Sequence, residues 1–283
     1  MPTPSLSLSY CAAELQRHDN DRFLCTLFAP VERREALFAL YAFNLEIAKT
    51  REVVSEPLLG QIRLQWWRDA IAGIYGGTPP PAHAVLEPLA AAIARHGLSR
   101  VYFDRLIDSR EADLTDEPPA SLEALVAYAE TTAVPLMALG LEILGAASPP
   151  ALDAARHAGT AVALSGLLRA VPFHARARRL YLPSDLLAAH GVRTNNLFEG
   201  KGDPGLAAVA EAVANRAASS ISEARTLRKK IPRVALPALL PLRLAAFELR
   251  RLRRARYNVF APHLATPSLL RPLPFLAGML RGW

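Results

Sequence analysis

The residue types that most often bind a divalent metal ion gather in one short stretch of the chain. Glu46, Glu52 and Glu56 follow one another closely, and carboxylate oxygens are the ligands that Mg²⁺ prefers. Two carboxylates four residues apart lie on one face of a helix, which is the spacing of Glu52 and Glu56. Pro57 directly follows Glu56, however, and places it at a helix end. We therefore interpret these glutamates as surface side chains on an exposed turn.

A second group of polar residues is basic. His174 lies among Arg169, Arg176, Arg178 and Arg179, and Tyr181 follows shortly after. An exposed histidine titrates near neutral pH, but neighbouring arginines lower its pKa and keep the ring neutral. Tyr181 can hydrogen-bond an anion or simply anchor its loop.

The other metal-binding residue types carry no usable pattern. Cys11 and Cys25 are too few for a disulfide framework or a four-ligand zinc site, so we expect buried free thiols. His83, His96 and His157 lack ligand spacing, and we interpret them as solvent-facing or core polar residues.

The positive charge of the chain is concentrated near its end. The formal net charge is +7, and residues 225–256 hold eleven Lys or Arg against one acid, Glu248. Such a run indicates a membrane surface, an acidic protein or a nucleic acid as a neighbour, or merely a solvated basic face. No zinc-finger or RNP-type pattern accompanies it, so we predict no nucleic-acid partner.

The elements that must position these residues are helices. Strong helix formers fill the segments between proline clusters, and strict alternation of β-branched residues is missing, so we predict an all-α fold. The expected helices cover residues 30–47, 58–75, 84–96, 99–113, 121–144, 151–171, 184–190, 206–230, 236–256 and 269–280. A turn or loop is expected at 176–183.

The spacing of the prolines favours one domain over 1–283, with its core at about 20–260 and peripheral segments at 1–19 and 261–283. The N-terminus lacks a basic region followed by an apolar one, and uninterrupted apolar stretches of membrane-spanning length are missing. We therefore expect a cytoplasmic protein.

Three segments, taken together and in order, carry a resemblance. They are 22–43, which contains RREALFALYAF, then LQWWRDA at 64–70, and GTAVALSGLLRAV at 159–171 with RRLYLP at 178–183. The set resembles the squalene/phytoene synthase family, and DSREADL at 108–114 with Ala127 and Tyr128 matches more weakly. The resemblance implies a single-domain isoprenoid-synthase-type helical bundle with a central pocket. It also implies enzymes that join two prenyl diphosphates head to head with the help of Mg²⁺.

The family's two acidic boxes are altered in this chain. By resemblance, their four positions fall on Ala48, Glu52, Ala170 and His174, and only Glu52 is a carboxylate. Lys49 occupies the middle of the first box. The resemblance therefore implies that the magnesium ligands are largely lost, so we expect no catalytic residue, bound metal or cofactor. Mg²⁺ is expected only if the chain is an enzyme, with Glu46 and Asp113 as substitute ligands.

The altered boxes imply a different pocket. If the family's packing holds, Lys49 faces Arg169, Arg179 and His174, and a basic pocket between apolar helices suits an anionic lipid or a phosphorylated ligand bound without metal. The predicted ligand-binding residues are these four together with Tyr41, Glu52 and Tyr181. Tyr41 either offers its ring to a cation or packs in the core.

Two strings narrow the resemblance. AFNLEIA at 42–48 and LLRAVPFHARARR at 167–179 resemble the squalene/phytoene-synthase-like assembly factors of mitochondrial complex I. This implies a degenerate synthase fold that assists complex I assembly, with complex I subunits and a prenyl or other anionic lipid as partners. Residues 225–256 would then contact the inner membrane peripherally. The alternatives are a divergent prenyltransferase acting on farnesyl or geranylgeranyl diphosphate, making squalene, phytoene or a hopanoid precursor, and a lipid-binding protein without an assembly role.

Overall fold

The computed structural model describes residues 8–202, 204–265, 275, 277 and 278. Over these residues the secondary structure is helical without any strand, so the predicted all-α fold is confirmed. The helices are α1 (Tyr10–His18), α2 (Asn20–Thr26), α3 (Val31–Ala48), α4 (Thr50–Val53), α5 (Pro57–Tyr75), α6 (Leu86–His96), α7 (Arg100–Ser109), α8 (Leu122–Ile143), α9 (Pro149–Arg176), α10 (Ser184–Ala189), α11 (Thr194–Phe198), α12 (Pro204–Thr226), α13 (Leu236–Leu239), α14 (Pro241–Arg254) and α15 (Pro262–Ala265). Short 3₁₀ turns cover Arg110–Leu114, Arg228–Lys230 and Arg233–Ala235.

The centre of the bundle is the pair α8 and α9. Gly159 of α9 lies so close to α8 that a Cβ atom at this position would meet the Val134 nitrogen at 3.1 Å and the Ala133 carbonyl carbon at 3.2 Å. Glycine permits this approach because it has no side chain. By length and apolar composition α8 could also cross a membrane, but 61% of its apolar window is buried inside the protein, as in a core helix.

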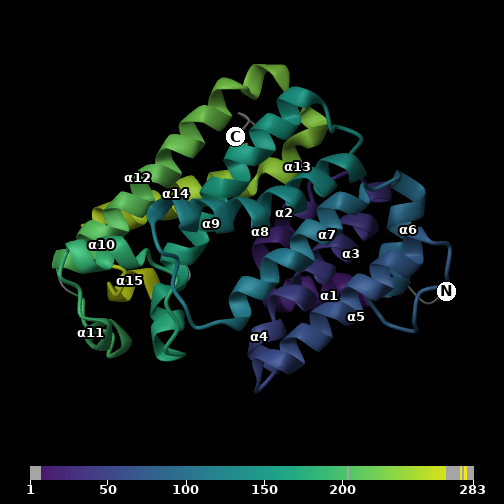
Figure 1. Ribbon diagram of the computed structural model, residues 1–283. Helices are drawn as coiled ribbons and strands as arrows, with labels where there is room; N and C mark the ends of the chain where they lie inside the picture. The colour runs from purple at the N-terminus through teal and green to yellow at the C-terminus, as the bar shows by residue number, and fades with distance from the viewer. Residues whose placement is uncertain (1–7, 203, 266–274, 276, 279–283) are drawn as a thin grey trace, which may run out of the picture.

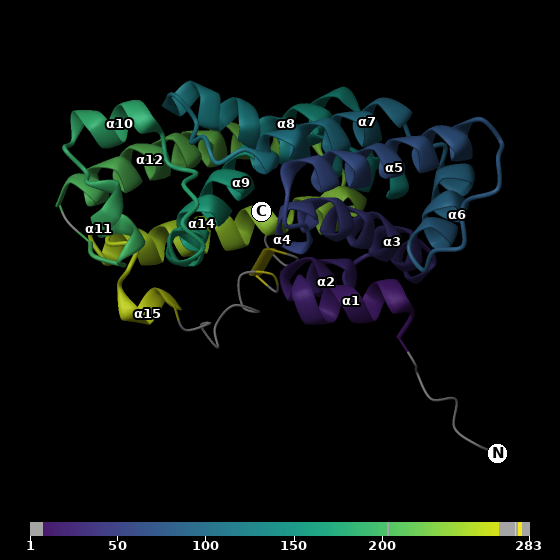
Figure 2. The ribbon, with the colours of Figure 1, turned by 60° about the horizontal axis from the view of Figure 1, so that its bottom comes forward.

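The N-terminal helices α1 and α2 pack against α3 (Figure 1). Figure 2 shows them on the side of α3 that faces away from α5 and α7. Most of α3 is buried, and the ring of Phe38 stacks on Phe23 of α2 with centroids 5.6 Å apart. Cys11 of α1 and Cys25 of α2 are both buried and free, as predicted. Helices α1 and α2 were not predicted from the sequence.

Helix boundaries follow local chemistry in most places. Pro30 precedes α3, and the Ser121 hydroxyl accepts a hydrogen bond from the Ala124 amide at 3.2 Å to cap α8, as the predicted starts require. By contrast, α9 continues through Pro172 to Arg176. A proline removes one backbone hydrogen bond, but Val171 and Ala175 on either side of Pro172 are buried and hold this turn against the core.

Three predicted helices end early or are divided. The helix expected at 99–113 stops at Ser109 and continues as a 3₁₀ turn, and the one expected at 206–230 stops at Thr226. The segment 236–256 is two helices, because Pro241 begins α14 directly after α13. The helix predicted at 269–280 falls largely outside the described residues.

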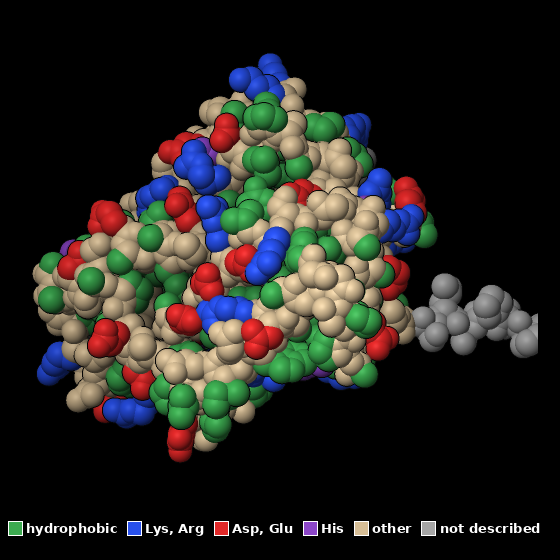
Figure 3. Space-filling view, turned by 45° about the vertical axis from the view of Figure 1, so that its right-hand side comes forward, with side chains coloured by type: hydrophobic (Ala, Val, Ile, Leu, Met, Phe, Trp, Pro, Cys, Tyr) green, Lys and Arg blue, Asp and Glu red, His purple; other side chains and the backbone are tan. Residues whose placement is uncertain are grey.

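The face that carries α5 and α7 has mixed charges. Basic and acidic side chains alternate there (Figure 3), as where Arg68 of α5 contacts both Asp108 of α7 and Glu111. Charges that neutralise one another in this way leave no single-sign patch on this face.

Candidate functional site

A cavity of about 450 Å³ lies in the middle of the molecule, between α2, the end of α3, α4, α8, α9 and α14. Apolar side chains such as Leu45, Val162 and Leu244 form part of its wall, and charged side chains form the rest. A cavity with both kinds of wall can hold a molecule that has an apolar body and a charged end.

The two altered boxes meet at this cavity. Ala48 and Glu52 come from α3 and α4, Ala170 and His174 come from α9, and all four line the wall. The residues far apart in sequence are therefore neighbours, as the resemblance predicts. Glu52 is exposed and forms no ion pair with any described residue.

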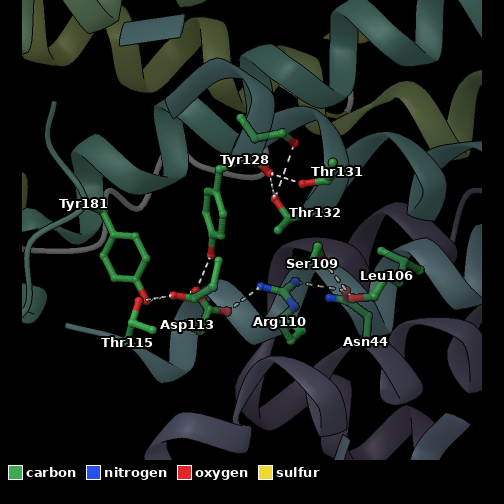
Figure 4. A network of polar contacts seen from close by, with 12 residues as sticks. Asn44, Leu106, Ser109, Arg110, Asp113, Thr115, Tyr128, Thr131, Thr132 and Tyr181 are labelled. Carbon is green, nitrogen blue, oxygen red and sulfur yellow. Dashed lines mark hydrogen bonds and ion pairs between the residues drawn. The ribbon is translucent and has the colours of Figure 1, made fainter. Parts of the chain in front are cut away.

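Asp113 organises one wall of the cavity (Figure 4). The Tyr128 and Tyr181 hydroxyls both donate to Asp113 Oδ1, at 2.6 and 3.0 Å, and Arg110 pairs with Oδ2 at 3.3 Å. The other end of the Arg110 guanidinium reaches Asn44 at 3.5 Å. Burial and the nearby carboxylate raise the pKa values of both tyrosines, so the phenols stay protonated and keep donating.

His174 and Arg179 form the adjoining wall. The His174 ring lies 4.5 Å from the Tyr181 ring, centroid to centroid. Burial, and secondarily the charge of Arg179, lower the pKa of His174 to about 4, so the ring is neutral at pH 7. Its Nδ1 atom has no hydrogen-bond partner among the described residues. Arg179 donates to the Arg51 carbonyl oxygen at 3.2 Å but forms no ion pair within the described chain.

Two of the seven predicted ligand-binding residues lie elsewhere. Lys49 does not face the arginines of α9, because its ammonium pairs with Glu46, whose other oxygen accepts from Arg63 at 2.7 Å. Glu46 is therefore engaged outside the cavity. Tyr41 is buried in the core, with the Arg22 guanidinium 5.8 Å from its ring centroid. The five that do line the cavity are Glu52, Arg169, His174, Arg179 and Tyr181.

Most of the acids that line this cavity were not predicted from the sequence. The described lining holds five carboxylates and five guanidinium groups, so the cavity as a whole is balanced and not basic, which differs from the expectation. The carboxylates belong to Asp19, Asp21, Glu52, Asp113 and Glu248, and the guanidinium groups to Arg22, Arg51, Arg110, Arg169 and Arg179.

Most of these carboxylates are already paired. Asp19 contacts Arg22, Asp21 contacts Arg169 at 3.3 Å, and the buried Glu248 contacts Arg251 at 2.9 Å. Arg22 opens the motif at 22–43, and Arg110 and Tyr128 lie in the weaker match, so the resemblance contained a signal for them. Asp21 and Glu248 had no such signal.

The donor set does not fit a magnesium clamp. Magnesium in proteins takes carboxylate and water oxygens in near-octahedral geometry. Among the described residues no group of three or more His, Cys, Asp or Glu side chains is placed to hold a metal ion. Apart from Glu52, the cavity carboxylates instead satisfy arginines. As built, the cavity suits an anion at Arg179 better than a cation.

Comparison with known sequences shows the family to which the chain belongs. The model of the family described as squalene/phytoene synthase matches residues 15–271. NADH dehydrogenase (ubiquinone) complex I, assembly factor 6, of Bos taurus is 35% identical over 264 residues, covering 93% of this chain and 79% of that protein. Presqualene diphosphate synthase of Rhodopseudomonas palustris is 30% identical over 205 residues, covering 72% of each chain.

Solved structures show the same fold. A dehydrosqualene synthase in complex with ligand superposes with a TM-score of 0.81 at 20% identity, covering 97% of this chain and 96% of that one. A squalene synthase from Alicyclobacillus acidocaldarius gives a TM-score of 0.77 at 20% identity, covering 88% of this chain and 93% of that one. At this identity the likeness concerns the helical architecture alone.

Proposed function

Because the chain belongs to the squalene/phytoene synthase family, we propose that it is a respiratory complex I assembly factor that binds an anionic lipid and does not synthesise one. The observation that carries this proposal is its 35% identity with the bovine assembly factor 6 across 93% of the chain. The match extends over most of the chain and is not limited to one short motif.

The cavity supports a binding role. A prenyl diphosphate or other anionic lipid has an apolar chain for the apolar wall and a charged end for Arg179, which lacks an ionic partner among the described residues. The Nε atoms of Arg51 and Arg110 and Nδ1 of His174 also lack hydrogen-bond partners there. Small side-chain shifts on binding would turn such groups toward an anion, which charge-assisted hydrogen bonds favour.

The proposed location is the cytoplasmic side of the inner membrane, with peripheral contact through residues 225–256 and complex I subunits as partners. The exposed Arg228, Lys229 and Lys230 and several arginines of α14 lie in this segment. Basic residues near an anionic bilayer each contribute about 1 kcal/mol of attraction.

The test is a deletion strain assayed for NADH dehydrogenase activity and for isoprenoid lipids. We expect the first to fall and the second to be unchanged, and we expect wild-type protein to restore activity. Glu52→Gln should restore it equally, because a metal ligand is not needed, while Arg179→Gln should restore it poorly. Normal complex I in the deletion strain together with missing isoprenoids would overturn the proposal.

The second candidate is a metal-dependent prenyltransferase, favoured by the 30% identity with presqualene diphosphate synthase. Incubation with farnesyl diphosphate and Mg²⁺ would then release diphosphate and give a C30 product, and Glu52→Gln would abolish both. The same variant therefore separates the two candidates, since it is silent in one and inactivating in the other. Boiled protein and protein with excess chelator are the controls.

A further inference from the structure

A second groove, separate from the central cavity, runs between α12 and α14. It encloses about 330 Å³, and its floor is apolar, formed by Ala214, Ala218, Ile221, Ala246 and Leu249. α12 and α14 lie side by side in both ribbon views (Figures 1 and 2). Arg225 of α12 and Arg250 and Arg253 of α14 stand along the groove. None of these residues lines the central cavity.

The three groove arginines are exposed and lie close to one another. Among the described residues none of the three forms an ion pair or a side-chain hydrogen bond. Partial burial, followed by the like charges of Arg225, Arg254 and Arg253, lowers the pKa of Arg250. Arg251, by contrast, pairs with Glu248 at 2.9 Å. Like charges held together in this way favour an anion between them.

Further hydrogen-bond donors complete the groove. Arg256 and Tyr257 have φ values of 53° and 59°, a left-handed conformation that side-chain-bearing residues rarely adopt. The Tyr257 amide donates to the Leu252 carbonyl oxygen at 2.9 Å, which closes the end of α14 and brings Tyr257 to the groove. Tyr257 and Asn215 thus add a phenol and an amide to the guanidinium groups.

We propose that this groove binds an anionic phospholipid, with the headgroup phosphate held by Arg225, Arg250 and Arg253 and the start of an acyl chain on the apolar floor. Guanidinium groups match phosphate oxygens in pairs, and the floor gives a reason for a lipid over free phosphate. The described lining of the groove contains one tyrosine and no row of aromatic side chains for stacking bases, which disfavours single-stranded nucleic acid. This site rests on the membrane contact proposed above and assigns that contact to defined residues of the groove.

The test is co-flotation of the full chain with phosphatidylcholine vesicles with and without phosphatidylglycerol. The variant is Arg250→Gln with Arg253→Gln, and the matched control is Arg95→Gln with Arg105→Gln, which removes the same charge from exposed positions on α6 and α7, outside both the groove and the basic segment 225–256. We expect binding only to the phosphatidylglycerol vesicles, weakened roughly tenfold to thirtyfold by the groove variant. The control should lose less than about threefold. Circular dichroism and thermal melting verify that both variants fold.

Equal losses in the two variants would overturn the proposal, because they would indicate a diffuse basic surface with no site. A second arm titrates inorganic phosphate and soluble dihexanoyl phosphatidylglycerol by calorimetry. If inorganic phosphate bound as tightly as the lipid and with the same sensitivity to the groove variant, the lipid assignment would be wrong. Complex I assembly is read separately in the complementation assay. Wild-type protein that complements normally but does not bind phosphatidylglycerol vesicles would therefore reject the groove and leave the proposed function standing.

Discussion

The central cavity and the α12–α14 groove use the same residue type in opposite ways. In the cavity, Arg22, Arg110 and Arg169 each pair with a carboxylate, and Arg110 is almost buried. In the groove, Arg225, Arg250 and Arg253 stand exposed beside one another without an acid among the described residues. An arginine whose charge is satisfied within the chain supports the fold, whereas an unsatisfied one is available to a ligand. Arg179 is the cavity arginine that belongs to the second kind.

The largest expected effect comes from breaking the Asp113 network. Asp113→Ala would leave Arg110, whose side chain is only 11% exposed, without its counter-ion and would free two tyrosine hydroxyls. Removing one partner of a buried pair costs about 3–5 kcal/mol in the free energy of unfolding. Guanidinium denaturation measures it, with Asp108→Asn as the surface control, expected to cost less than about 1 kcal/mol. Similar losses of stability in both variants would show that the buried Asp113–Arg110 pair contributes no more than an exposed surface pair.

The next effect depends on pH and on His174. Its pKa is lowered to about 4 in the folded protein, whereas the unfolded value is near 6.5. The unfolded chain therefore binds the proton first, so this contribution is fully present above pH 6.5 and is lost as pH falls toward 4. We expect wild-type protein to lose about 2 kcal/mol more than His174→Gln between pH 7 and 4. Parallel stability–pH curves for the two proteins would show that the ring is not held neutral.

A smaller effect is expected where a cavity pair is open to solvent. Arg169 and Asp21 are 3.3 Å apart with side chains 46% and 21% exposed. Exposed pairs contribute little, so Arg169→Gln should lower the free energy of unfolding by at most about 1 kcal/mol, and less in high salt. Urea denaturation at two ionic strengths checks this. A loss as large as that of Asp113→Ala would mean that exposure does not separate these pairs.

The smallest effect should have the opposite sign. Arg250→Gln removes repulsion with Arg253 and Arg254 on the same helix face, so we expect a gain of about 0.2–0.5 kcal/mol at low salt. The gain should fade as salt screens the charges. Thermal melting resolves it, with Arg228→Gln as the control. A loss of stability would show that Arg250 supports the fold, as the paired cavity arginines do.

The sequence predicted the helical fold, the family and the meeting of Ala48, Glu52, Ala170 and His174, because ordered motifs on long helices fix their register. It did not predict that Lys49 turns away from the cavity, since Glu46 lies one turn earlier and competes for the ammonium group. Nor did it predict the acids opposite the arginines, because Asp21 and Glu248 come from helices whose mutual packing no local pattern records. The expected basic cavity failed for that reason.

The differences between predicted and observed helix boundaries at prolines had a different cause. Pro172 does not end α9, yet Pro241 separates α13 from α14. Proline specifies the loss of one donor, and the tertiary environment decides whether the chain bends, stops or continues there. The N-terminal helix α1 was missed because it is short and polar on average, so its sequence carries a weak helical signal, and tertiary packing against α3 supports it.

The close approach at Gly159 has a consequence for the central cavity. α8 contributes Tyr128 and Thr132 to the lining of the central cavity, and α9 contributes Ser165 and Ala170, so the two helices form two walls of the same cavity. A methyl group at position 159 would meet the α8 backbone and act as a wedge between them. The spacing of these two walls therefore depends on a residue outside the described lining of the cavity, and we expect Gly159→Ala to push them apart.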